Sequence, residues 1–167
     1  MRRLAAWTVA IALPTLVSAS RATAISSTID PIRSVQAQML PNRSIVDQLV
    51  FNTPLSRFRL ERGRAKRAQP WLNPSTDGCS APLIGSSGRS FNFRLACERH
   101  DFAYANYSLL SARGIDVEWN EALRASVDDQ FQRDMQSLCA VRRKSERLRC
   151  DAWTIVFFHT VRIAAGT

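Results

Sequence analysis

Hydrophobic residues recur every three to four positions in the C-terminal part of the chain, which is the spacing of an amphipathic α-helix. The pattern predicts a helix from about Phe93 to Leu110, a second from about Val117 to Leu138 and a third from about Asp151 to Ala165. Gly114 and Asp116 break the chain between the first two helices. The sequence therefore predicts an all-α domain. The apolar stripes of the second and third helices consist of Leu123, Val127, Phe131, Met135 and Leu138, and of Trp153, Phe157, Val161 and Ala164.

The rest of the chain lacks a sustained period. Proline and glycine are frequent from Trp71 to Phe93, which predicts a loop, and the charged stretch Ala140–Arg149 predicts another. Residues 20–67 are rich in Ser, Thr, Arg and Pro, with one short helix expected around Ser44–Phe51. We therefore expect a flexible leader over residues 25–67, followed by a folded domain over residues 68–167.

The first 24 residues are typical of a secretory signal peptide. Arg2 and Arg3 precede the apolar stretch Leu4–Val17, and small residues suited to cleavage end at Ala19 and Ala24. The apolar stretch is shorter than the roughly 18–20 residues that span a membrane, which argues against an anchor. The sequence thus predicts a secreted protein.

The four cysteines all lie in the last 89 residues. In an oxidising compartment they are expected to form disulfides, and four cysteines allow three pairings. We favour the two local loops, Cys79–Cys97 and Cys139–Cys150. Each bridge contributes on the order of 3 kcal/mol by restricting the unfolded chain.

The formal net charge of +9 is concentrated at the N-terminal end. Residues 1–67 hold 11 basic and 3 acidic residues, a net +8, and residues 68–167 hold 12 and 11, a net +1. The domain itself therefore has no basic surplus for binding nucleic acid. The Lys66-Arg67 pair suggests cleavage of a pro-segment, and a solvated linker is the alternative reading.

The run CERHDFAYAN, from Cys97 to Asn106, places three chemically active residue types within one helical turn. Cys97 and Asp101 are four residues apart and share a helix face. A bridge from Cys97 to Cys79 would draw Asp77 toward Asp101. Two carboxylates with loop carbonyls suit Ca²⁺, whereas oxidised cysteines and one histidine make a poor zinc site.

His100 lies beside this predicted cation, where it is expected to stay neutral and able to accept a proton. A general base of this kind needs a carboxylate that orients the ring and stabilises the imidazolium. Asp128 and Asp134 both border the apolar stripe of the second helix, while Asp129 falls on its polar side. The pattern alone does not choose between Asp128 and Asp134.

These residues resemble the motif C-x-R-H-D-F-G-Y-x-N of the small secreted phospholipases A2 of bacteria and fungi. Three further stretches are similar to the same family in the same order, over about the last 95 residues. They are DGC at Asp77–Cys79, VDDQFQRDMQSLC at Val127–Cys139 and CDAWTIVFFHTVRI at Cys150–Ile163.

The resemblance implies a small disulfide-stapled domain with two antiparallel catalytic helices. It implies that His100 is the general base, that Asp128 is its partner, and that Ca²⁺ is held by the Asp77 and Asp101 side chains and the Gly78 carbonyl. The reaction implied is hydrolysis of the sn-2 ester of glycerophospholipids by a monomer at a membrane or micelle surface.

Three features depart from the family pattern. Ala103 stands where the family has glycine, and Gly78 replaces a larger apolar residue. The connection Ser111–Glu121 between the two catalytic helices is also several residues longer.

Other functions fit the composition less well. A metal-dependent phosphohydrolase would need a histidine upstream of His100, and the sequence has none. A nuclease using His100 and His159 would draw support from the basic charge, which belongs to the leader. The remaining alternative is a non-catalytic secreted module that binds lipid or protein and requires neither Ca²⁺ nor His100.

Overall fold

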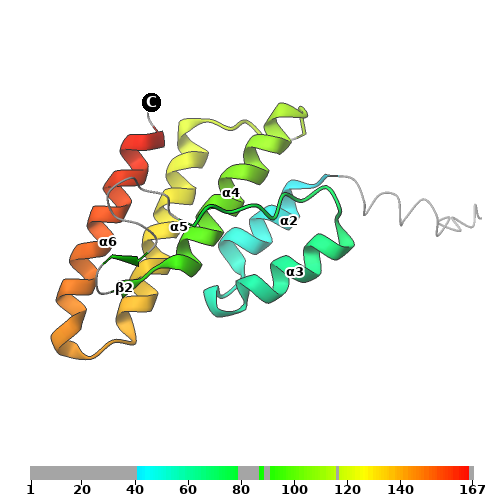
Figure 1. Ribbon diagram of the computed structural model, residues 1–167. Helices are drawn as coiled ribbons and strands as arrows, with labels where there is room; N and C mark the ends of the chain where they lie inside the picture. Colours follow the sequence, from blue (N-terminus) through cyan, green and yellow to red (C-terminus); the bar gives the residue numbers. More distant parts are fainter. Residues whose placement is uncertain (1–40, 79–86, 89–90, 116, 166–167) are drawn as a thin grey trace, which may run out of the picture.

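The structure, a computed structural model, describes residues 41–78, 87–88, 91–115 and 117–165. Three long helices lie side by side, α4 (Arg94–Ala112), α5 (Glu121–Ala140) and α6 (Lys144–Ala165), with shorter helices on the far side of α4 (Figure 1). The expected all-α class is confirmed. The shorter elements are α2 (Arg43–Asp47), the π-helical turn η1 (Gln48–Asn52), the 3-10 turn η2 (Leu55–Arg57), α3 (Phe58–Ala68) and the antiparallel strands β1 (Ser87–Gly88) and β2 (Phe91–Asn92).

The helices α4 and α5 agree with the sequence prediction to within a few residues. The helix α6 does not, because it begins at Lys144, whereas the sequence predicted a charged loop as far as Arg149. Most residues of that stretch are good helix formers, and Glu146 in the first turn favours the helix dipole. Charge alone was therefore a poor indicator of a loop.

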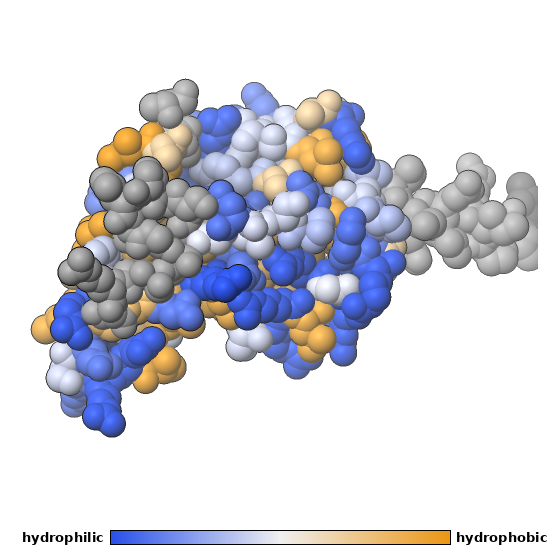
Figure 2. Space-filling view, in the orientation of Figure 1, coloured by the Kyte–Doolittle hydropathy of each residue, from blue (hydrophilic) through white to orange (hydrophobic). Residues whose placement is uncertain are grey.

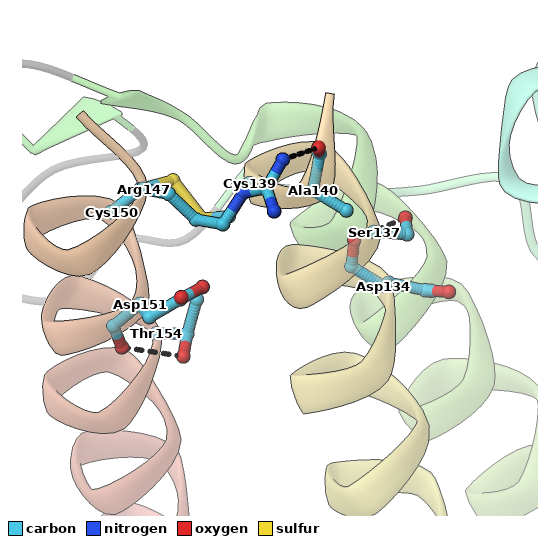
Figure 3. The surroundings of a disulfide bond; sticks show 8 residues. All are labelled: Asp134, Ser137, Cys139, Ala140, Arg147, Cys150, Asp151 and Thr154. Carbon is cyan, nitrogen blue, oxygen red and sulfur yellow. Dashed lines mark hydrogen bonds between the residues drawn. A yellow bond between two sulfur atoms is a disulfide. The ribbon is translucent and has the colours of Figure 1, made fainter. Parts of the chain in front are cut away.

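The turn between α5 and α6 is closed by the predicted Cys139–Cys150 disulfide (Figure 3). Arg147 Nη2 donates to the carbonyl oxygen of Ala140 at 2.7 Å, which caps the last turn of α5. Cys97 is also disulfide-bonded. Its predicted partner, Cys79, lies outside the described residues.

Two hydrophobic clusters hold the helices together. The predicted α5 stripe supplies both of them, with Val127 in one and Phe131 and Met135 in the other. Phe157 of α6 packs in the second cluster beside the Cys139–Cys150 bridge. The periodicity therefore identified the buried face of α5 correctly. Among the described residues, no helix is long and apolar enough to cross a bilayer.

The second half of the expected flexible leader is instead part of the folded domain. The predicted short helix around Ser44–Phe51 is present as α2 and η1, and α3 follows it. Val46, Val50 and Phe58 are fully buried in the cluster that contains Phe102 of α4. Isolated helices this short are marginal in water, so their order depends on this packing.

The prediction of a flexible leader is therefore wrong for residues 43–67. The signal peptide and residues 25–40 lie outside the described residues. Arg67 occupies the last turn of α3, so cleavage after it would detach the buried residues Val46 and Phe58 from the domain. Processing at that position remains an untested prediction.

Arg99 of α4 is a buried cation that joins three elements. Its Nη1 donates to the carbonyl oxygens of Val50 at 2.9 Å and Thr53 at 2.8 Å, at the end of η1. Its Nε lies 3.1 Å from Asp134 Oδ2 on α5. The guanidinium thus fixes the N-terminal helices and α5 to the same turn of α4.

We expect Arg99→Met to destabilise the fold by about 3–5 kcal/mol, because it leaves the buried Asp134 carboxylate without its ion-pair partner and two carbonyls without their donor. The free energy of unfolding, measured by denaturant titration, tests this. The matched control is Arg94→Met on the same helix, where an exposed arginine pairs with Glu98 and its loss is expected to cost less than about 1 kcal/mol. Equal losses in the two variants would contradict the assigned role of Arg99.

Candidate functional site

His100 of α4 and Asp128 of α5 face each other between the two antiparallel helices. His100 Nε2 lies 2.8 Å from Asp128 Oδ1, a hydrogen-bond distance. The Asp128 side chain is 1 % exposed and the His100 side chain 11 %. The rings of Tyr104 and Phe131 lie against the imidazole, with centroid separations of 4.5 and 4.9 Å. The imidazole is therefore held in one orientation.

Tyr104 and Arg162 complete the surroundings of Asp128. The Tyr104 hydroxyl donates to Asp128 Oδ1 at 2.8 Å, and burial together with this hydrogen bond raises the pKa of Tyr104 well above its usual value. The hydroxyl therefore stays protonated and remains a donor. Asp128 Oδ2 has no hydrogen-bond partner among the described residues, but Arg162 Nη1 of α6 lies 3.6 Å from it. The buried carboxylate thus has two hydrogen-bonding partners at Oδ1, His100 and Tyr104, and the positive charge of Arg162 near Oδ2.

The structure distinguishes the two aspartates that the sequence pattern left open. Asp128 contacts His100, whereas Asp134 pairs with Arg99 and accepts a hydrogen bond from Gln130 at 2.9 Å. Burial raises the pKa of Asp134 to about 6, against the opposing effect of Arg99. Asp129 is exposed, as expected.

The loop before α4 brings its acidic residues toward Asp101. Asp101 Oδ2 accepts hydrogen bonds from the Thr76 hydroxyl at 2.6 Å and from the Gly78 amide at 2.9 Å. Burial, and to a lesser degree the nearby charge of Asp77, raise the pKa of Asp101, while the two hydrogen bonds lower it. Asp77, Gly78 and Asp101 therefore lie close together, as the sequence predicted.

This arrangement fits a hard cation in its donor chemistry. The charge of Asp77 helps to raise the pKa of Asp101, so the two carboxylates are neighbours, and the Gly78 amide holds the loop backbone against Asp101. Ca²⁺ prefers carboxylate and carbonyl oxygens of this kind. Within the described residues, no group of three or more His, Cys, Asp and Glu side chains forms a metal cluster, so backbone oxygens or water would have to complete the shell.

Sequence reasoning missed Tyr104, Thr76 and Arg162. Tyr104 stands one helical turn after His100 inside the CERHDFAYAN run, so the i, i+4 spacing was a usable signal. Thr76 and Arg162 gave no local signal, because their contacts with Asp101 and Asp128 join distant parts of the chain.

The sequence is similar to those of known proteins. A family model described as "Prokaryotic phospholipase A2" matches residues 46–165. A "Secretory phospholipase A2" of Beauveria bassiana is 32% identical over 126 residues, which cover 75% of this chain and 60% of that protein. A protein of the same name from Arthroderma benhamiae is 29% identical over 97 residues, 58% of this chain and 59% of its own length. The chain thus spans about 60% of the length of these curated relatives.

Gly78 adopts a φ of 69°, in the left-handed region that favours glycine. We expect Gly78→Ala to destabilise the fold by about 1 kcal/mol. Backbone strain is the whole of this cost, because an added Cβ would meet no atom within 4 Å and so would not clash. Gly63→Ala in the middle of α3 is the matched control and should stabilise by about 0.5–1 kcal/mol. Thermal unfolding of both variants checks the opposite signs. A stabilising Gly78→Ala would contradict the assigned backbone conformation.

Proposed function

Because the chain belongs to the prokaryotic phospholipase A2 family, we propose that it hydrolyses the sn-2 ester of glycerophospholipids in a calcium-dependent reaction. The products are a fatty acid and a lysophospholipid. The observation that carries the proposal is the hydrogen bond between His100 Nε2 and buried Asp128, next to the acidic group formed by Asp77 and Asp101.

His100 acts as the general base in this mechanism. If Nε2 carries the proton donated to Asp128, Nδ1 presents its lone pair and can take a proton from water. That water attacks the ester carbonyl, and Asp128 stabilises the imidazolium that forms. Tyr104 and Phe131 hold the ring plane, so the base is oriented before the substrate arrives.

The Asp77 and Asp101 side chains and the Gly78 carbonyl would hold the calcium ion. When bound, Ca²⁺ supplies positive charge for the phosphate of the substrate and for the developing oxyanion. The Thr76 hydroxyl and the Gly78 amide orient the Asp101 carboxylate, which fixes the position of one ligand relative to His100.

The relatives named secretory phospholipase A2 support export of this protein as well. We propose that the first 24 residues direct secretion and that residues 43–67 stay with the domain, because their apolar side chains belong to its core.

Fatty-acid release from mixed phospholipid vesicles tests the reaction. The oxidised full chain is expected to release fatty acid with Ca²⁺ and not with a chelator, and His100→Ala should lower the rate by about 100-fold or more. Equal release with and without Ca²⁺ would remove the cation from the mechanism. No release from the folded wild type under either condition would instead favour a non-catalytic binding module.

The roles of the three aspartates of α5 separate in a variant series. Asp128→Asn should reduce the rate by about 100-fold or more, because the imidazolium loses its stabilising charge. Asp134→Asn should act mainly on the free energy of unfolding, because it leaves Arg99 buried without its carboxylate. The exposed Asp129→Asn is the control and should change neither quantity. A rate loss confined to Asp134→Asn would contradict the proposed pair.

A further inference from the structure

The face of α6 that points away from α5 is unusually apolar. Among the described residues, five of the six exposed large hydrophobic residues lie between residues 141 and 163. Leu148 is 83% exposed, Ile155 51%, Val156 43% and Ile163 72%. Single exposed apolar residues are ordinary on protein surfaces, but several large ones on one helix face mark an interaction site.

The spacing makes this row a single stripe. Leu148, Ile155 or Val156, and Ile163 follow one another at intervals of seven or eight residues, which places them on one face of a helix. The stripe is about 22 Å long at 1.5 Å per residue. The opposite face of α6 carries the buried Phe157, so the helix has large apolar side chains both toward the core and toward solvent.

Cationic residues surround the N-terminal end of this stripe. Residues 141–149 contain five basic residues and one acidic residue, with Val141 and Leu148 exposed among them. Figure 2 shows hydrophobic surface along the α6 edge of the molecule and hydrophilic surface around the α5–α6 turn. Exposed apolar side chains interleaved with Arg and Lys are typical of surfaces that lie on anionic lipid.

The stripe is also connected to the site described above. Arg162, the residue before Ile163, extends from α6 to within 3.6 Å of Asp128 Oδ2. A surface that binds along the C-terminal half of α6 therefore lies next to the helix pair that holds His100.

The basic helix α3 is a weaker candidate for the same role. It lies on the other side of α4 (Figure 1) and has Leu60 as its only exposed large hydrophobic residue. Several of its charges are also compensated, since Glu61 pairs with Arg64 and Glu98 pairs with Arg59. It therefore offers charge without the apolar row that would enter a membrane surface.

We propose that the outward face of α6 together with residues 141–149 is the surface by which this protein docks on anionic phospholipid membranes. The choice of lipid as the occupant rests on the proposed function, whereas the position of the surface follows from exposure and charge. The apolar stripe would enter the region between headgroups and acyl chains, and the arginines and lysines would contact lipid phosphates.

Vesicle flotation tests the surface with the oxidised chain from residue 25 onward, so that the apolar signal peptide does not itself bind lipid. Chelator keeps the lipid intact. Vesicles of phosphatidylcholine with and without phosphatidylglycerol are the probes. The wild type should float with the anionic vesicles, and Ile155→Ser/Ile163→Ser should reduce the bound fraction by roughly tenfold or more. Arg143→Glu/Lys144→Glu should remove the preference for anionic lipid.

The matched control is Leu60→Ser/Arg67→Glu on α3, which alters the same chemistry on another face and should float like the wild type. Absence of wild-type flotation, or an equal loss in the control, would overturn the proposal. So would a concentration-dependent dimer that the α6 isoleucine variant abolishes, because the stripe would then be covered by a second copy.

A second readout keeps this proposal separate from the catalytic one. On a short-chain phospholipid dispersed as monomers, the α6 variants should retain the wild-type hydrolysis rate, because no surface has to be bound. A wild type that floats but hydrolyses neither substrate would reject the proposed function and leave the docking surface standing. A loss on the dispersed substrate equal to the loss on vesicles would reject the docking surface.

Discussion

The buried carboxylate of Asp128 is the group on which the arrangement of this molecule depends. A carboxylate removed from water is costly unless donors and positive charge surround it. Here His100 and Tyr104 of α4 supply hydrogen bonds at 2.8 Å, and Arg162 of α6 supplies charge at 3.6 Å. Because these partners come from both neighbours of α5, the three long helices have to keep a fixed register for Asp128 to remain satisfied.

That register is maintained at points away from Asp128 itself. Arg99 is the neighbour of His100 in sequence, yet it joins α4 to Asp134 and to the end of η1. The Cys139–Cys150 bridge holds the beginning of α6 against the end of α5. The site is therefore rigid because two separate sets of contacts fix α4 and α6 to the two sides of α5.

The same helix connects the proposed chemistry with the proposed membrane surface. α6 buries Phe157 in the core, directs Arg162 to Asp128 and leaves Ile155 and Ile163 exposed. The proposed function needs both a dry site and a surface that tolerates lipid, and one helix with three differently used faces would provide both. The predicted catalytic roles and the docking surface thus depend on the placement of a single element.

The sequence by itself determined the helical class, the buried stripe of α5, the Cys139–Cys150 bridge and the group of His100, Asp77 and Asp101. The helical class, the stripe of α5 and the pair of His100 and Asp101 depend on periodicity and on spacings of a few residues, which local chain geometry translates directly into proximity. The bridge and the approach of Asp77 were expected from the pairing of cysteines in an oxidising compartment. The helical pattern left Asp128 and Asp134 open and the family resemblance implied Asp128, which the tertiary structure places against His100. Only the tertiary structure decided that Arg162 reaches Asp128 and that Val46, Val50 and Phe58 belong to the core. Those outcomes depend on which helix faces meet and on contacts between residues far apart in the chain. The helical period of a sequence shows which face is buried, but it does not show which neighbouring helix covers that face.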